Sequence, residues 1–324
     1  RDHCVTGVQT CALPICVMRN GFEVKEAWMP AGRLGILASA GGKGKTSLLV
    51  HLAGHVAAGA DWCGLTVVKP GAVALVLGEE DLNECHRRLQ RAWGPMLEHE
   101  RRRAAARTLV LPLAGTGENR LVDDSNNGPP AKTPRAEDLV AYLKAAAPKD
   151  GGWSLVVVDP FARFAGMNAE TDNASATSTM TVLEELTKLP GNPTVLVAHH
   201  TRKGGKDDGS GSDRVELIRG SSAIKDAARW AAMLEADPLP DDESGNGRAV
   251  LRVVKSNYTS TAYAVELKTR YGIPTDGKVR PIRELDGKPD PKPKAEGAGA
   301  VANAAKNGDR RGDPKHKARG ATQA

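Results

Sequence analysis

Residues 31–46 read AGRLGILASAGGKGKT, a short apolar run followed by a glycine-rich loop that ends in Gly-Lys-Thr. The apolar run predicts a strand, and a helical stretch follows from Lys45 to about Ala58. In such a loop, between a strand and a helix, backbone N–H groups turn inward around a phosphate, and the positive end of the helix lies behind them. This stretch therefore predicts a phosphate-binding Walker A loop.

The positions of this loop have different expected roles. Lys45 is expected to reach the β- and γ-phosphates of ATP, and Thr46 is expected to hold Mg²⁺. The first glycine of the usual motif is Ser39 here, so the contact at that position departs from the pattern. The expected nucleotide-binding residues are Ser39, Ala40, Gly41, Gly42, Lys43, Gly44, Lys45, Thr46 and Ser47.

Strands and helices alternate beyond the loop, which favours an α/β fold with a central, mostly parallel twisted sheet flanked by helices. The wholly apolar run 155–158 suits a strand that is covered on both faces. Further strands are predicted at 72–77, 108–112 and 194–198, and helices at 82–93, 134–147 and 174–189. The polar stretch 115–135, rich in Gly, Asn and Pro, predicts a surface loop.

The character of the chain changes after Lys203. Residues 204–213 predict a flexible polar loop, and a short helix is expected from Ser221. A C-terminal β hairpin region is expected next, with β segments at 230–235, 248–255 and 263–267. We therefore assign residues 17–285 to one ATPase domain.

Residues 286–324 predict a disordered basic tail, with nine Lys or Arg and five Asp or Glu. This tail carries most of the formal net charge of +6. Bulk charge therefore does not make the core a DNA-binding protein, and any nucleic-acid contact there must come from local patches.

Two acidic residues at strand ends are candidates for the chemistry of ATP hydrolysis. Asp159 ends the apolar run LVVVD and is expected to hold the Mg²⁺ shell through water. Glu79, Glu80 and Asp81 follow the run AVALVL, where RecA-like motors place the carboxylate that deprotonates the attacking water. We favour Glu80, with helix capping by Asp81 or solvated charge as the structural alternatives.

Two further residues have expected roles near the γ-phosphate. His199 and His200 end the strand TVLVA, and we favour His200 as the side chain that detects the γ-phosphate. Arg219, after the flexible loop, is expected to act as an arginine finger across a subunit boundary. A structural ion pair is the competing interpretation for Arg219. Lys255 is a further candidate.

The motifs AGGKGKTSLLVHLA, LGEEDLNECHRRL, VVVDPFARF, VLVAHHTRKG, RGSSAIKDAARW and VVKSNY follow one another over about residues 31–260. In this order they resemble the RepA-type hexameric replicative helicases of plasmids. The resemblance implies a RecA-like P-loop NTPase fold, ATP with Mg²⁺, a ring hexamer and single-stranded DNA in the central channel. It gives Lys45, Thr46, Glu80, Asp159, His200 and Arg219 their ATP-site roles, and Arg88 aligns with a further family arginine. A primase or a replication initiator is an expected partner.

The family grips DNA with mobile loops that face the channel. The stretch from Lys203 to Arg214 matches one such loop, and the expected phosphate contacts are Arg202, Lys203, Lys206 and Arg214. A plain connector is the structural alternative for this stretch.

Three other functions stay open beside the helicase. The first is a RecA- or KaiC-like ATPase that acts as a recombinase or switch without unwinding DNA. The second is the helicase half of a primase–helicase whose N-terminal half is missing. The least favoured is a nucleotide-binding regulator without activity, because Glu80 fills the hydrolytic role.

The N-terminal residues 1–16 resemble a translated sequencing-library adapter, so we exclude them from reasoning about the fold. This exclusion leaves Cys63 and Cys85, which have no metal-binding spacing. Two isolated cysteines, no long apolar segment and no visible signal peptide lead us to expect a cytoplasmic protein without membrane contact.

Overall fold

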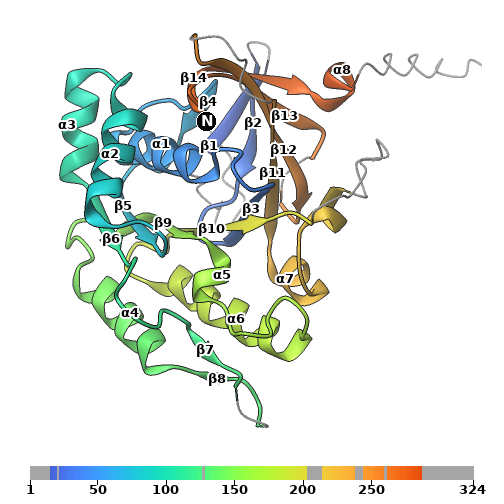
Figure 1. The fold of residues 1–324 in the computed structure, drawn as a ribbon. Helices are drawn as coiled ribbons and strands as arrows, with labels where there is room; N and C mark the ends of the chain where they lie inside the picture. The colour runs from blue at the N-terminus through green and yellow to red at the C-terminus, as the bar shows by residue number, and fades with distance from the viewer. Residues whose placement is uncertain are drawn as a thin grey trace, which may run out of the picture. The chain divides into compact units, whose positions relative to one another are not determined.

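The computed structural model describes residues 15–19, 22–125, 128–202, 214–237, 244–258 and 261–286. At its centre is a nine-stranded sheet in the order β14-β13-β12-β11-β3-β10-β9-β5-β6 (Figure 1). Strands β11, β3, β10, β9, β5 and β6 pair in parallel, and β12, β13 and β14 continue the sheet in antiparallel pairs. The predicted α/β fold with a mostly parallel sheet flanked by helices and a C-terminal β hairpin region is confirmed.

The parallel strands are buried on both faces, which explains their uninterrupted apolar sequences. In β5, for example, Val73 and Leu75 pack into one core cluster, and Ala74 and Val76 pack into the other. The parallel strands are β3 (Leu34–Ser39), β5 (Ala72–Leu77), β6 (Thr108–Pro112), β9 (Trp153–Asp159), β10 (Thr194–His200) and β11 (Trp230–Ala236).

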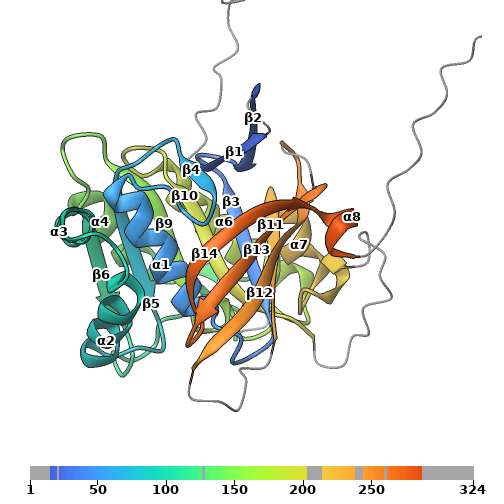
Figure 2. The ribbon, with the colours of Figure 1, turned by 90° about the horizontal axis from the view of Figure 1, so that it is seen from above.

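Helices cover both faces of the sheet (Figures 1 and 2). One face packs against α1 (Lys45–Ala58), α2 (Leu82–Trp93) and α3 (Glu98–Ala106). The other face packs against α4 (Pro134–Ala145), α5 (Phe161–Phe164), α6 (Asn173–Glu185) and α7 (Ser222–Ala227). The 3-10 turn η1 (Leu186–Lys188) extends α6.

The antiparallel strands β12 (Asn246–Ser256), β13 (Tyr263–Arg270) and β14 (Ile273–Pro281) form the C-terminal end of the sheet. Their inner side chains join the same core cluster as α1, and β14 lies beside that helix (Figure 2). The sequence did not predict β14, because Pro274, Gly277 and Pro281 weaken its strand signal.

Other local expectations have mixed outcomes. The predicted bounds of α1, α2 and β5 are confirmed. Helix α3 was not predicted, because only its Ala104 is buried and the rest of its sequence is highly charged. The expected loop 115–135 contains two short paired strands, β7 (Val122–Asp123) and β8 (Ala131–Lys132). The expected flexible loop 204–213 lies outside the described residues.

A small three-stranded sheet joins β1 (Ile15–Arg19), β2 (Phe22–Met29) and β4 (Leu65–Val67). Strand β1 begins within the adapter-like stretch 1–16, whose other residues lie outside the description, as do residues 287–324. The last described turn is α8 (Ile282–Leu285). No helix in the described ranges is long and apolar enough to cross a membrane.

Candidate active site

The candidate site lies where four parallel strands end at one edge of the sheet. Strand β10 lies between β3 and β9, with His200 beside Ser39 in the register. Strand β5 flanks β9 on its other side and places Leu77 beside Asp159. The topology therefore brings together the phosphate-binding loop, both candidate acidic residues and the candidate histidine, as expected for a crevice at the carboxyl ends of parallel strands.

The loop between β3 and α1 has the backbone conformation that a phosphate cradle needs. Gly42 and Gly44 have φ angles of 72° and 84°, in the left-handed region that glycine adopts without strain. Helix α1 begins at Lys45, and no side chain caps its first turn. The N–H groups of that turn are therefore available to an anion at the end of the helix.

Lys45 is folded back onto this loop. Its Nζ donates to the carbonyl oxygens of Ser39 at 3.1 Å and Ala40 at 3.2 Å, and to Ser39 Oγ at 3.1 Å. Burial lowers the pKa of Lys45, and the carboxylates of Asp159 and Glu79 partly oppose that shift. Ser39, the departure from the usual motif, therefore contacts the lysine directly.

Thr46 and Asp159 form the candidate metal-binding pair. Asp159 is 3% exposed, and the Thr46 side chain hydrogen-bonds its carboxylate. Its Oδ2 is buried without a hydrogen-bond partner among the described residues. Burial raises the pKa of Asp159. A buried carboxylate with a free oxygen beside a threonine hydroxyl suits a hard cation such as Mg²⁺.

Glu79 and Glu80 have different environments. Glu80 is 6% exposed, its Oε1 lies 3.1 Å from Arg88 Nη2, and burial raises its pKa to about 7. The side chain of Glu79 is 50% exposed, and its Oε1 accepts from Arg163 Nε at 3.1 Å. Asp81 caps α2 by accepting from Glu84 N at 2.8 Å. The buried, weakly acidic carboxylate is thus the one that the sequence favoured as the base.

The two histidines also differ. The Nδ1 atom of His200 lies 3.4 Å from Lys45 Nζ, and burial lowers its pKa. His199 is buried, its ring packs edge-on against Phe161, and its Nε2 is 2.7 Å from the Arg219 carbonyl oxygen. Burial lowers the pKa of His199 to about 4. His200 therefore faces the site, whereas His199 packs beneath it.

Arg219 does not line the cavity of its own chain. Its Nη2 lies 2.7 Å from Glu170 Oε2, and its side chain is 53% exposed. The ion pair that competed with the finger interpretation is therefore present. Lys255 Nζ donates to the Lys225 carbonyl oxygen at 2.6 Å, away from this cavity.

The four residues predicted to contact DNA have different environments in the structure. Arg202 is exposed, and its Nη2 donates to the Gly220 carbonyl oxygen at 3.3 Å. Lys203 and Lys206 lie outside the described residues. Arg214 lies on the 3-10 turn η2 (Arg214–Leu217) and is buried. Its guanidinium lies within 4 Å of the carboxylates of Glu235 and Asp286, so its position does not favour a phosphate contact.

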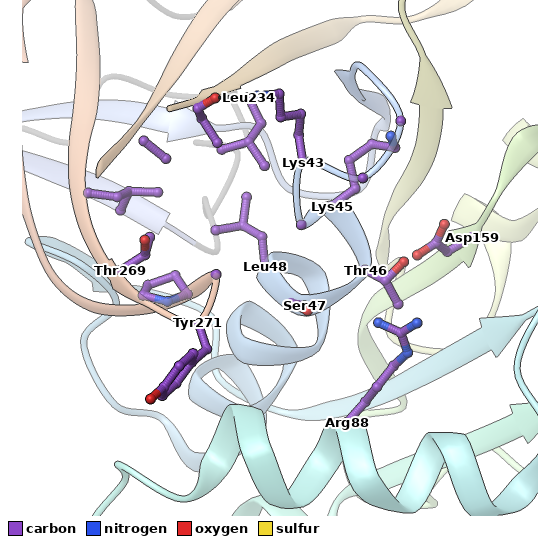
Figure 3. Close-up of a pocket in the computed structure, with 18 of the residues that line it drawn as sticks. Lys43, Lys45, Thr46, Ser47, Leu48, Arg88, Asp159, Leu234, Thr269 and Tyr271 are labelled. Carbon is purple, nitrogen blue, oxygen red and sulfur yellow. Dashed lines mark hydrogen bonds between the residues drawn. The ribbon is translucent and has the colours of Figure 1, made fainter. Parts of the chain in front are cut away.

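A cavity of about 710 Å³ connects these strand ends with the C-terminal strands (Figure 3). One wall is the phosphate-binding loop with Glu80, Arg88, Asp159 and His200. The other wall comes from β11, β12, β13 and β14 and includes Leu234, Thr269 and Tyr271. The sequence predicted β segments in three of these strands but did not place them at the site. A local signal for the unpredicted strand was the Tyr271-Gly272 turn, which joins β13 to β14.

Comparisons with known proteins found a matching family and a solved structure with partial similarity. A family model described as an AAA domain matches residues 23–206, more than half of the chain. The matched range contains the loop 39–47, Glu80, Asp159 and His200, and it ends before Arg219. Among solved structures, the chain is similar to the crystal structure of the RadB recombinase, with 17% identity and a TM-score of 0.46. That similarity covers 75% of this chain and 90% of the other.

Proposed function

Because the chain belongs to the AAA domain family, we propose that it hydrolyses ATP with Mg²⁺ and uses the energy to move along single-stranded DNA as a ring helicase. One observation carries the hydrolytic part of this proposal. A single cavity is lined by the lysine of a phosphate-binding loop, a buried aspartate with a free oxygen and a buried glutamate whose pKa is raised to about 7.

The cavity has the parts that a nucleoside triphosphate needs. The loop 39–47 and the start of α1 offer N–H groups and the Lys45 ammonium to the phosphates. The wall formed by Leu234, Thr269 and Tyr271 offers apolar and aromatic surface to the nucleoside. Mg²⁺ would be held by Thr46 and Asp159, where it neutralises charge on the phosphate oxygens.

The chain's own residues then have separate tasks. Glu80 accepts a proton from the attacking water, for which a raised pKa and a buried position are suited. Lys45 exchanges its contacts with the loop carbonyls for contacts with the phosphate oxygens. His200, beside that lysine, detects whether the γ-phosphate is present.

The ring and the DNA path extend this proposal to the assembly. Arg219 lies outside its own cavity and is half-exposed, which suits a cation that completes the site of a neighbouring subunit. We propose a hexamer, in line with the resemblance to RepA-type helicases, with DNA bound near Arg202 and the segment that follows it. A recombinase or switch without unwinding activity is the alternative that shares the same ATP site.

The decisive experiment measures ATP turnover with and without single-stranded DNA, in parallel with displacement of a labelled strand from a forked duplex. For a helicase, single-stranded DNA should increase the rate of ATP turnover. The labelled strand should be displaced only while ATP is hydrolysed. DNA-stimulated turnover without strand release would favour the recombinase or switch. An ATP turnover rate that does not change when DNA is added would contradict the proposed DNA motor. Only the proposed ATPase activity would then remain.

A further inference from the structure

The two carboxylate oxygens of Glu80 have different surroundings. Oε1 lies 3.1 Å from Arg88 Nη2. Oε2 is buried and has no hydrogen-bond partner among the described residues. Both Glu80 and Arg88 line the cavity at the strand ends. The carboxylate is therefore held through one oxygen, and the other oxygen has no hydrogen bond among the described residues.

Arg88 reaches this position from the second turn of α2. Its Nε lies 3.0 Å from Glu84 Oε1, so the guanidinium bridges an acid of the helix to Glu80. Asp81 fixes the start of the helix by accepting from Glu84 N. Figure 3 shows the guanidinium group of Arg88 rising from α2 toward Thr46 and Asp159. The guanidinium therefore lies between two carboxylates, with Nη2 toward Glu80 and Nε toward Glu84.

Arg88 also provides a positive charge to Glu80, which lies among several other acids. Glu79, Glu84 and Asp159 all disfavour the ionised form of Glu80, and so does burial, whereas Arg88 favours it. A buried carboxylate without a paired cation either takes up a proton or moves toward solvent. The Arg88 contact therefore partly offsets the effect of burial on Glu80 and holds its carboxylate in place.

We propose that Arg88 is a positioning residue that holds Oε1 of Glu80 and thereby fixes the carboxylate, so that Oε2 remains available as the proton acceptor. This inference rests on the proposed ATP hydrolysis. In that step the water oxygen bonds to the γ-phosphorus, the bond from that phosphorus to the β–γ bridging oxygen breaks, and the water proton passes to Oε2. Arg88 takes no part in the transfer itself.

The test compares Arg88→Ala and Arg88→Lys with a matched control on the same helix. Arg87 is 75% exposed and pairs with Glu84, so Arg87→Ala removes a neighbouring arginine without touching Glu80. Arg88→Ala is expected to lower kcat about 10- to 100-fold, the effect of a misplaced catalytic group, with the KM for ATP within about twofold. Arg88→Lys should recover part of kcat, and Arg87→Ala should resemble the wild type.

A second set of variants separates this inference from the proposed function. If Arg88 acts through Glu80, adding Arg88→Ala to Glu80→Gln causes no further loss of turnover. A further loss would show that Arg88 acts independently. Unchanged kcat in Arg88→Ala, or a raised KM at constant kcat, would overturn the positioning role. Full turnover in Glu80→Gln alone would refute the assigned base, and the role of Arg88 would fall with it.

Discussion

At the scale of single residues, the site depends on burial as much as on residue type. Two adjacent glutamates follow β5, yet only Glu80 is buried with a pKa raised to about 7, whereas Glu79 is half-exposed and paired with Arg163. The sequence identified both carboxylates and favoured the second. The partner of each carboxylate was not predictable, because Arg88 and Arg163 approach from different elements.

This difference predicts the phenotypes of two isosteric substitutions. Glu80→Gln should retain ATP binding and lose at least about a hundredfold in kcat, the scale of a lost general base. Glu79→Gln should keep most of the turnover, because its carboxylate is half-exposed and bound to Arg163. Steady-state turnover and equilibrium binding of a fluorescent ATP analogue measure both effects. If Glu79→Gln lost turnover and Glu80→Gln kept it, the general base would be Glu79 instead of Glu80.

A buried histidine away from the strand ends predicts how stability depends on pH. His51 Nδ1 accepts from Trp62 Nε1 at 2.9 Å, and burial, with a smaller effect of His55, lowers the pKa of His51 to about 3. An unfolded histidine has a pKa of about 6.5, so the unfolded chain takes up this proton first as the pH falls. The contribution to stability is complete above about pH 6.5 and is lost toward pH 3, by up to about 1.4 kcal/mol per pH unit.

Replacement of His51 by glutamine keeps an acceptor for Trp62 and removes the titration. His51→Gln should flatten the fall in the free energy of unfolding between about pH 6.5 and pH 4. Urea unfolding at a series of pH values measures the slope. An unchanged slope, with a variant that is folded at pH 8, would show that His51 does not contribute to it.

At the scale of elements, the parts with strong periodicity or apolar content were predictable. The strands β3, β5, β9 and β10 and the helix α1 follow from their sequences because each is apolar and bounded by glycine or charge. Helix α3 was missed because only its Ala104 is buried, and strand β14 was missed because its prolines and glycine weaken the strand signal. The second wall of the cavity was not predictable although three of its four strands were, because its position beside the phosphate-binding loop depends on the order of the strands in the sheet.

The packing of α1 on α2 predicts that a glycine-to-alanine exchange in α1 lowers stability, although alanine favours helices over glycine. A Cβ atom added to Gly54 would lie 2.3 Å from Trp93 Nε1, which donates to the Val50 carbonyl oxygen. Alanine in a helix usually gains up to about 1 kcal/mol over glycine, but overpacking a core costs about 1–3 kcal/mol. Gly54→Ala should therefore lower the free energy of unfolding, as measured by urea denaturation.

A control at an open position makes this outcome specific. The same exchange at Gly128 meets no atom within 4 Å, so Gly128→Ala should leave the free energy of unfolding near the wild-type value. A gain in stability for Gly54→Ala would show that Trp93 moves aside without cost. That result would contradict the close packing of α1 against α2.

At the scale of the whole molecule, the proposed ring would share each ATP site between two subunits. One chain supplies the loop 39–47, Glu80, Asp159 and His200 at one edge of one sheet, and Arg219 lies outside that cavity. In other phosphoryl-transfer enzymes, a second cation at the γ-phosphate raises the rate of hydrolysis by about 10³- to 10⁵-fold. For Arg219 to supply it, the guanidinium must exchange its contact with Glu170 for the neighbour's nucleotide.

Mixed assemblies test this arrangement. Arg219→Ala and Lys45→Ala subunits should each be inactive alone, and mixtures should regain turnover where an intact loop meets an intact arginine. The recovery should follow the mixing ratio in an ATPase assay. Mixtures that stay inactive although both variants assemble, or a fully active Arg219→Ala protein, would show that the site does not need the neighbour's arginine.

The central claim is that ATP is hydrolysed in the cavity at the carboxyl ends of the parallel strands. The most direct measurement is ATP turnover of the wild-type protein and of Lys45→Ala, with single-stranded DNA added to both. We expect turnover in the wild type, and we expect loss of hydrolysis with weakened ATP binding in Lys45→Ala, because its ammonium lies over the phosphate-binding loop. Wild-type turnover in a folded Lys45→Ala protein would contradict the assignment.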